Sequence, residues 1–366
     1  MFKIFVINPG STSTKLALYN DTRCAFDTNI HHPGNELAPF PDIISQYDYR
    51  RQVIESVLRK ENIPVQDIDA FVGRGGLLKP IPAGTYAVDQ KMLDDLRQGV
   101  QGQHASNLGG LLAFELARIN NRPAFIVDPV VVDELNEFAR LAGHPDFCRR
   151  SIFHALNHKA VGRKAATLLA RKYSELNLII AHLGGGISIA AHEHGRVTDV
   201  NNALDGEGPY SPERAGTLPA GDLVRLCFSG KYTREQVLKM ITGRGGFVAW
   251  LGTNNLVDVM QRIEEKNDIQ AQVILNGMIY QVVKEIGAMC AVLKGQVDAI
   301  VLTGGIANNS YITDQITDRV SFIAPVLLIP GEEEMEALAF GAYRVLSGDE
   351  AAKNYANEAK VYDNKL

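Results

Sequence analysis

Cysteine pairs and long apolar runs are missing from this 366-residue sequence, and each absence excludes a class of protein. The four cysteines lie far apart and form no CxxC pair, which argues against a disulfide framework or a cysteine-ligated metal site. No stretch approaches the roughly 18 consecutive apolar residues that a membrane-spanning helix needs. The opening MFKIFVINPG lacks the charged region and the apolar core of a signal peptide. We therefore expect a reduced, cytoplasmic protein without a membrane partner.

Concentrated positive charge is also missing. The sequence has 37 basic and 42 acidic residues, a net charge of −5 and no basic block. Nucleic-acid binding requires a concentrated positive surface, so we expect no nucleic-acid partner. The hydrophobic content of 46% and the charged content of 22% are typical of globular proteins, and the length predicts two domains.

The stretch from Phe2 to Tyr19 predicts a two-strand hairpin with a polar tip. An apolar run, FKIFVI, is followed by NPGSTSTK and then by a second apolar run, LALY. Small hydroxyls, backbone N–H groups freed by a glycine and one ammonium are groups that hold phosphate oxygens. An ordinary exposed turn has a similar composition and stays an alternative for this stretch taken alone. The candidate phosphate-binding residues are Asn8, Ser11, Ser13 and Lys15.

The pattern of the first half returns in the second half. The hairpin at 2–19 resembles the strand, glycine turn and strand at 178–199. Likewise, the strand and double glycine at 67–76 resemble those at 297–306. This order indicates an internal duplication at domain scale, with two α/β domains that offer loops at strand ends to a shared cleft.

Amphipathic and apolar patterns predict the main helices and buried strands. The strands expected outside the hairpins are 68–72, 124–127 and the PVLLIP segment. The expected helices are 48–62, 90–99, 106–119, 151–173, 270–293 and a helix over MEALAFGAYRVLSG.

Neither common nucleotide-binding signature is present. Residues 10–15 read GSTSTK, without the second glycine of GxxxxGK[ST], and no GxGxxG follows a strand to open a helix. A phosphate site would instead use the tips of the two hairpins and the loop at 303–309, where glycines let the backbone approach a ligand. The candidates in the second half are Gly184, Gly185, Gly186, Gly304, Gly305 and Asn308.

Together these motifs resemble the acetate and butyrate kinase family, within the superfamily of sugar kinases and actin-like ATPases. The matching stretches are INPGSTSTK, VGRGG, HASNLGG, VDP, RRSIFHALNHK, HLGGGIS, LTGGIANN and PGEEEMEALA. The short length and the GGG tripeptide are closer to the butyrate branch. The resemblance implies two duplicated actin-like ATPase (ribonuclease H-like) domains, with mixed sheets flanked by helices and an interdomain cleft. The expected limits are 1–147 plus 340–366 for the N-terminal, acceptor-side domain and 148–339 for the nucleotide-binding domain.

The resemblance also implies a reaction. A short-chain carboxylic acid, butanoate in the first place, would take the γ-phosphoryl group of ATP by in-line transfer to give an acyl phosphate and ADP, with Mg²⁺. The acceptor is already ionised at pH 7, so the reaction needs charge neutralisation rather than a general base. Acetate, propionate or a branched acid is an alternative acceptor, and an actin-like nucleotide-sensing ATPase is an alternative of a different class. The family further implies small-molecule partners and a homodimer or a higher homo-oligomer.

One arginine and several histidines are the candidate catalytic and substrate-binding residues. Arg74 follows a buried strand within GRGG, and its planar fork suits a substrate carboxylate, although it could be a surface arginine. The resemblance assigns His154 to the transferring phosphoryl group, and His104 and His182 to positions near the acceptor and the phosphates. His158 would share a helix face with His154, and an HxxxH pair is also a possible metal ligand.

Carboxylates and a second arginine complete the predicted site. Asp128 ends a buried strand, where a carboxylate needs a partner, and the resemblance assigns it to Mg²⁺ or to alignment of the acceptor. The register of GEEEME permits Glu332, Glu333 or Glu334 as a second ligand, and we favour Glu332 and Glu334; a solvated acidic helix start is the alternative. Acetate kinases carry a second arginine in a TRSGD-like segment, whereas this chain reads ERAGTLPAGD. Either Arg214 reaches the site by a different path or that role has moved.

Overall fold

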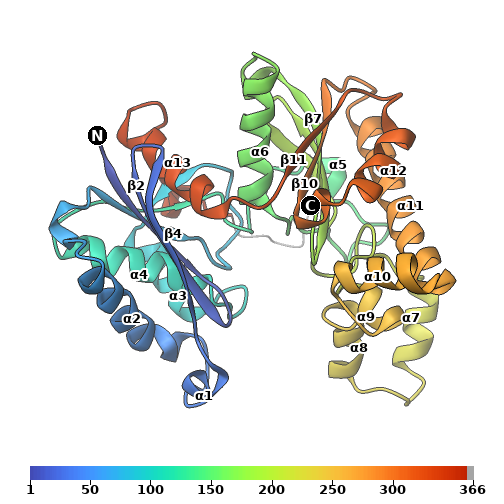
Figure 1. The fold of residues 1–366 in the computed structure, drawn as a ribbon, viewed down its shortest axis with the longest axis horizontal. Coiled ribbons are helices and arrows are strands. Elements are labelled where there is room, and N and C mark those ends of the chain that lie inside the picture. The colour runs from blue at the N-terminus through green and yellow to red at the C-terminus, as the bar shows by residue number, and fades with distance from the viewer. Residues whose placement is uncertain (361–366) are drawn as a thin grey trace. The chain divides into compact units, whose positions relative to one another are not determined.

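The chain divides into two compact units, shown in Figure 1 as a ribbon. The first unit contains Met1–Asp133 and the residues from Glu333 onward, and the second contains Glu134–Glu332. This computed structural model describes residues 1–360, so the last six residues of the predicted N-terminal domain lie outside the described part. The domain limits expected from the sequence, 1–147 plus 340–366 and 148–339, stay a prediction.

The first unit is built on a seven-stranded mixed sheet, in the order β12-β5-β6-β4-β1-β2-β3 over the described residues. Strands β1, β4 and β6 run parallel to one another, while β2, β3 and β5 are antiparallel to their neighbours β1, β2 and β6. Strands β1, β4 and β6 are buried along nearly their whole length, which is typical of parallel strands that are covered by helices. The strands are β1 (Lys3–Pro9), β2 (Ser13–Asn20), β3 (Arg23–His31), β4 (Ala70–Arg74), β5 (Thr85–Ala87), β6 (Ala124–Val127) and β12 (Lys353–Asn354).

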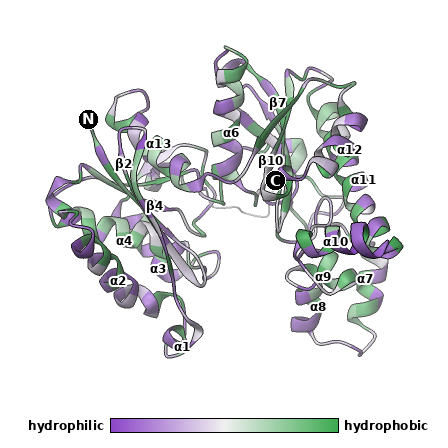
Figure 2. Cartoon of the chain, in the orientation of Figure 1, coloured by the Kyte–Doolittle hydropathy of each residue, from purple (hydrophilic) through white to green (hydrophobic). Residues whose placement is uncertain are grey.

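Helices α4 and α13 both contact the central strands β1, β4 and β6. Helix α4 is mostly hydrophobic and buries most of its residues, whereas α2 is mostly hydrophilic and buries one stripe (Figure 2). The helices of this unit are α1 (Gly34–Leu37), α2 (Tyr47–Lys60), α3 (Gln90–Gln98), α4 (Asn107–Arg118), α13 (Glu334–Leu346) and α14 (Tyr355–Glu358), with 3₁₀ turns η1 (Ile44–Gln46) and η2 (Val65–Asp67).

Helix α4 crosses β4 at very short range because glycines stand at the crossing. A Cβ atom on Gly73 would lie 2.1 Å from the carbonyl oxygen of Gly109, and one on Gly109 would lie 2.3 Å from the carbonyl oxygen of Arg74. Only a residue without a Cβ fits at either position. The glycines around Arg74 therefore serve the packing of the helix against the strand, in addition to any function of the loop.

The second unit is built on a five-stranded mixed sheet, in the order β11-β10-β7-β8-β9. Its strands are β7 (Asn177–Leu183), β8 (Ile187–Glu193), β9 (Arg196–Val200), β10 (Ala299–Gly304) and β11 (Val326–Pro330). Its helices are α5 (Glu137–Arg140), α6 (Ala155–Leu168), α7 (Ala220–Cys227), α8 (Arg234–Ile241), α9 (Gly246–Leu251), α10 (Leu256–Lys266), α11 (Ile269–Val292) and α12 (Ser310–Val320), with 3₁₀ turns η3 (Tyr173–Glu175) and η4 (Gly305–Asn308). Helix α11 lies against β7 and β8 and supplies much of the buried core of this unit. No helix among residues 1–360 is long and apolar enough to cross a membrane.

The strand orders confirm the internal duplication. In the first unit the order β3-β2-β1-β4-β6 places the opening hairpin beside two parallel strands. In the second unit β9-β8-β7-β10-β11 follows the same order with the same directions. The two predicted hairpins are β1–β2 and β7–β8, and each is extended by a third antiparallel strand.

The predicted helix at 151–173 is too long at both ends. Helix α6 spans Ala155–Leu168, and Tyr173 begins the separate turn η3. The backbone before α6 is held elsewhere, because the carbonyl of Ile152 accepts a hydrogen bond from the amide of Ala203 at 2.9 Å. His154 therefore stands at the N-cap position, directly before the first turn of the helix.

We predict that Gly109→Ala lowers the free energy of unfolding by about 1 to 3 kcal/mol, because the added methyl group collides with the β4 backbone. Denaturant unfolding measures the change. The matched control is Gly287→Ala, since Gly287 also lies in a helix but nothing stands within 4 Å of its Cβ position. The free energy of unfolding of the control should rise by up to about 1 kcal/mol, because alanine has a higher helix propensity than glycine. If both variants raised the free energy of unfolding equally, the close packing of α4 on β4 would be contradicted.

Candidate active site

Three predicted residues lie at one edge of the first sheet, where its parallel strands end. Strands β1, β4 and β6 finish at Pro9, Arg74 and Val127, and Arg74 pairs with Val127 across the ladder. Asn8 is the next-to-last residue of β1, and Asp128 directly follows β6. The carboxyl ends of parallel strands are the usual ligand-binding edge of α/β sheets.

Arg74 and Glu334 form a bidentate ion pair at this edge. The Nη2–Oε1 distance is 2.8 Å and the Nη1–Oε2 distance is 2.9 Å. The Nδ2 of Asn8 also donates to Oε2 of Glu334 at 2.8 Å. The structure thus joins three predicted site residues, and it places a carboxylate in the guanidinium fork that the sequence analysis assigned to the substrate carboxylate.

Asp128 and His104 occupy the surroundings of this ion pair. The carboxylate of Asp128 is buried and accepts a hydrogen bond from the amide of Gly84 at 2.7 Å. Its φ of 37° is an uncommon conformation for a residue other than glycine, and such conformations concentrate at functional sites. Nδ1 of His104 lies 2.8 Å from Oγ of Ser106. Desolvation lowers the pKa of His104, and the positive charge of Arg74 lowers it further.

The tip of the β1–β2 hairpin is a tight turn with exposed polar side chains. The amide of Gly10 donates to the carbonyl of Ser13 at 2.8 Å. The side chains of Ser11 and Lys15 are exposed, and Lys15 pairs with Asn8 across the hairpin. Paired residues of an antiparallel ladder share one face, so Lys15 and Asn8 lie on the same side of the sheet.

Arg50 holds this tip from behind, and the sequence analysis missed it. Its side chain is fully buried and donates to the carbonyls of Ser11 at 3.2 Å and Ser13 at 3.0 Å. Among residues 1–360 no carboxylate lies within ion-pair distance of it, and burial lowers the pKa of this guanidinium. One signal was available in the sequence: Arg50 is spaced at helical intervals with Ile54 and Leu58, which form the buried stripe of α2.

Thr14 links Arg50 to a second buried side chain. Its Oγ1 accepts from Nη1 of Arg50 at 3.0 Å and lies 2.8 Å from Nε2 of His32. Burial, and after it the charge of Arg50, lower the pKa of His32 to about 4. His32 is therefore neutral at pH 7, and the positive charge behind the tip is that of Arg50.

Two predicted histidines stack in the second unit. The rings of His154 and His182 lie 3.8 Å apart at an angle of 13°. Nδ2 of Asn157 donates to the carbonyl of Gly331 at 3.3 Å, which leaves its Oδ1 to accept a hydrogen bond from Nδ1 of His182 at 2.8 Å. Nε2 of His182 is buried without a hydrogen-bond partner in the described residues and lies 3.4 Å from Oε1 of Glu332.

The glycine tip of the β7–β8 hairpin lies between these groups and Arg214. A Cβ on Gly184 would lie 3.0 Å from Nε2 of His182, and one on Gly186 would lie 1.8 Å from Nη1 of Arg214. Arg214 therefore packs directly on the tip, although its segment departs from the TRSGD-like pattern. It donates to the carbonyl of Ala203, and burial lowers its pKa.

The end of β10 supplies the last predicted phosphate-binding residues. Gly304 has a φ of 87°, and a Cβ there would lie 2.3 Å from the carbonyl oxygen of Leu183, so only glycine fits. Gly305 is exposed, and Nδ2 of Asn308 donates to its carbonyl at 3.0 Å. This loop therefore passes beside the glycine tip of the hairpin.

The predicted metal ligands do not form a cluster within the described chain. In residues 1–360 no three side chains of His, Cys, Asp or Glu come close enough to hold an ion. Asp128 and Glu334 belong to the first unit and Glu332 to the second. The rings of His154 and His158, the HxxxH pair, both lie 2.9 Å from Oγ of Ser188.

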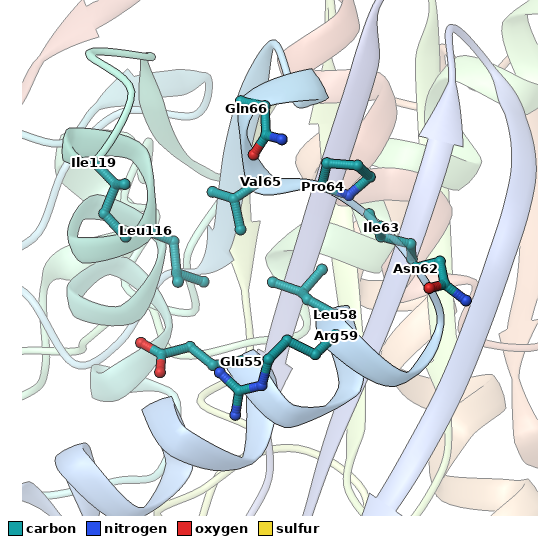
Figure 3. A pocket seen from close by; sticks show the side chains of 10 residues that line it. All are labelled: Glu55, Leu58, Arg59, Asn62, Ile63, Pro64, Val65, Gln66, Leu116 and Ile119. Carbon is teal, nitrogen blue, oxygen red and sulfur yellow. The ribbon is translucent and has the colours of Figure 1, made fainter.

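The first unit contains a pocket of about 450 Å³ (Figure 3). Leu58, Val65 and Leu116 surround it. It is formed where α2 ends and η2 leads into the start of β4, at the opposite end of that strand from Arg74. No predicted site residue lines it.

Comparison with known proteins gives a consistent set of relatives. Residues 137–353 match the acetokinase family. Butyrate kinase 2 of Clostridium acetobutylicum is 55% identical over 354 residues, with 97% of this chain and 99% of the relative covered. Butyrate kinase 1 of the same organism is 54% identical over 355 residues, covering 97% and 100%.

Two solved structures share the fold. Acetate kinase from Porphyromonas gingivalis has a TM-score of 0.76 at 19% identity, covering 96% of this chain and 100% of that one. A propionate kinase from Francisella tularensis has a TM-score of 0.71 at 18% identity, covering 93% and 99%. These likenesses show the actin-like ATPase fold with mixed sheets flanked by helices, as the resemblance of the motifs implied.

We predict that Arg50→Lys accelerates amide hydrogen exchange at residues 10–14 by about tenfold or more, because a charged hydrogen bond contributes about 1.5 to 3 kcal/mol. A lysine keeps the charge but loses the fork that reaches two carbonyls. Exchange measured by mass spectrometry on peptides that cover the tip tests this. Arg51→Lys is the matched control, because Arg51 pairs with Glu55 on the same helix and does not contact the tip. The assignment of Arg50 fails if both variants exchange alike.

Proposed function

This chain belongs to the acetokinase family, and from that premise we propose that it transfers the γ-phosphoryl group of ATP to butanoate, giving butanoyl phosphate and ADP. The observation that carries the proposal is 55% identity, over 97% of the chain, to a relative named butyrate kinase. The family uses ATP and ADP with small-molecule substrates. A homodimer or higher homo-oligomer stays a prediction from the family.

Arg74 is the proposed clamp for the substrate carboxylate. The bidentate pair with Glu334 supports this role, because in it the fork holds a side-chain carboxylate by two charge-assisted hydrogen bonds. Butanoate is ionised at neutral pH and needs no base. The clamp instead offsets the repulsion between two approaching anions and orients the attacking oxygen for in-line transfer. His104, beside Arg74, is the proposed second group of the acceptor site.

The two hairpin tips are the proposed phosphate-binding loops. In the first, Ser11, Ser13 and Lys15 donate to phosphate oxygens, with the buried charge of Arg50 behind them. In the second, the glycine backbone from Gly184 to Gly186 approaches the phosphates, with Arg214 packed on it. Gly304, Gly305 and Asn308 are proposed to lie along the nucleotide.

His154 is the proposed group that stabilises the transferring phosphoryl group. Charge develops on the equatorial oxygens during transfer, and a preorganised N–H donor at that point lowers the barrier. His182 stacks on its ring and directs Nε2 toward the glycine tip.

Mg²⁺ is the proposed cofactor beside the nucleotide. Its usual donor set is one or two carboxylates with phosphate oxygens and waters, so a cluster of three protein ligands is not required. Asp128, buried with its carboxylate anchored by a backbone amide, fits this chemistry, and Glu332 and Glu334 are the other candidates. When bound, the ion would neutralise charge on the phosphate oxygens.

Acetate, propionate or a branched acid stays the alternative acceptor. A nucleotide-sensing ATPase stays the alternative of a different class. The first experiment is a hydroxamate assay with ATP and Mg²⁺ across acids of two to six carbons. We expect the highest kcat/KM with butanoate, and loss of product with excess EDTA that Mg²⁺ restores. ATP hydrolysis without acyl phosphate would instead support the ATPase.

We predict that Arg74→Ala raises the KM for butanoate by about tenfold or more, with little change in the KM for ATP, because it removes a charged hydrogen-bonding clamp. Steady-state kinetics in both substrates measure this. Arg51→Ala is the control for loss of one arginine from the same unit. If Arg74 only anchors Glu334, Arg74→Ala and Glu334→Gln will lower the melting temperature alike and leave the butanoate KM unchanged, which would refute the clamp.

A further inference from the structure

Behind His154, the second unit contains a continuous chain of hydrogen bonds that the proposed reaction does not otherwise use. It begins at Tyr173 on the 3₁₀ turn after α6, passes two histidines and a serine, and ends at Nδ1 of His154. The distances are 2.6 Å from Tyr173 Oη to His192 Nδ1, 3.2 Å from His192 Nε2 to His158 Nδ1, 2.9 Å from His158 Nε2 to Ser188 Oγ and 2.9 Å from Ser188 Oγ to His154 Nδ1.

The middle of this chain is sealed from solvent. His158, His192 and Ser188 each have 0% of their surface exposed. Burial lowers the pKa of both histidines well below the ordinary value, and the positive charge of Lys159 acts in the same direction. Both rings are therefore neutral at pH 7, and each has one N–H donor and one bare nitrogen acceptor.

The single proton on each member forces a common direction. Both ring nitrogens of His158 and His192 are engaged within the chain, so a ring that accepts on one side must donate on the other. The hydroxyl of Ser188 could accept from both rings, but within residues 1–360 these two rings are its only side-chain partners. Because Ser188 is fully buried, its own proton is satisfied only if it donates to one ring while the other ring donates to it. All the protons must therefore point toward His154 or all must point away from it.

Tyr173 decides between the two directions. A phenol, with an ordinary pKa of about 10, is a much stronger acid than the N–H of a neutral imidazole, so it is the better donor at 2.6 Å from Nδ1 of His192. When Tyr173 donates to Nδ1 of His192, the proton of His192 must stand on Nε2, from which it donates to Nδ1 of His158. His158 in turn donates from Nε2 to Ser188. Ser188 then donates to Nδ1 of His154, and the ring proton of His154 must stand on Nε2.

We propose that Tyr173 is a positioning residue that fixes, through this chain, the tautomer of His154 in which Nε2 carries the proton. The inference rests on the proposed role of His154 at the phosphoryl group. In this tautomer Nε2 can donate to a phosphoryl oxygen, whereas the other neutral tautomer would present a lone pair to it. A partner behind a functional histidine that sets its tautomer is a common device in enzymes.

The packing of α6 is adapted to keep the phenol in place. A Cβ on Gly162 would lie 2.6 Å from Cε2 of Tyr173, so the ring occupies space that only a glycine leaves open. The ammonium of Lys159 and the guanidinium of Arg163 each lie 5.9 Å from the centre of the ring. Lys159 is in turn held by Glu134 at 2.6 Å. The phenol is thus fixed independently of any ligand.

The decisive variant is Tyr173→Phe, which removes the first donor and keeps the ring. We expect ¹⁵N spectra of the histidine-labelled protein to show the Nε2–H tautomer of His154 in the wild type and a mixture of tautomers in the variant. His154→Gln identifies the signal. We also expect kcat to fall about tenfold, the size typical for loss of a group that orients a ligand, with both KM values unchanged. Tyr210→Phe is the matched control, because Tyr210 is a part-buried tyrosine of the same unit that donates to the carbonyl of Ile274, outside the chain.

Two further variants separate a role through the chain from a packing role. Ser188→Ala breaks the chain next to His154, so adding Tyr173→Phe to it should cause no further loss of kcat. Gly162→Ala should reproduce the tautomer mixture without removing any polar atom. An unchanged His154 signal in Tyr173→Phe, or additive losses in the double variant, would overturn the proposal. The ¹⁵N readout needs no substrate, so failure of the proposed reaction, seen as absence of acyl phosphate in the wild type, is a separate result.

Discussion

The ion pair between Arg74 and Glu334 joins parts of the chain that are 260 residues apart. Arg74 stands at the end of β4, and Glu334 is the first residue of α13, by which the chain returns to its first unit. Asn8, at the end of β1, completes the contact. Because a half-buried charge is costly without a partner, this pair fixes where α13 starts relative to the sheet edge. The proposed acceptor site depends on that placement.

Duplication has produced two sheets with one strand order but with different chemistry at their hairpin tips. The first tip has small hydroxyls and a lysine, and the buried charge of Arg50 lies behind it. The second tip has glycines, and its charge comes from Arg214, which packs on the backbone. Both solutions place positive groups and backbone amides at the end of a strand pair. The same topology therefore presents side chains at one tip and backbone at the other, in keeping with the two phosphate-binding roles that we propose for them.

A row of hydrogen-bonded, buried neutral histidines distinguishes the second unit. A neutral imidazole has one donor and one acceptor, so a row of them transmits hydrogen-bond direction without net charge. His158 and His192 act in this way between Tyr173 and Ser188. Desolvation is what makes them useful, since it keeps both rings uncharged at neutral pH. His154, at the end of the row, thereby gains the defined tautomer that we propose for it.

The sequence by itself determined the features that depend on neighbours along the chain. Alternating and helical patterns located the two hairpins, the buried strands and most helices, and glycine and hydroxyl clusters marked the tips, because strand ends and turns are local. Tertiary structure alone decided which distant groups meet. The partner of Arg74, the position of Arg50 behind a tip and the row from Tyr173 to His154 all depend on the packing of non-adjacent segments, whose register no local pattern encodes. The predicted start of helix α6 was wrong for the same reason. A tertiary backbone hydrogen bond at Ile152, and not local helix propensity, holds the segment before the helix.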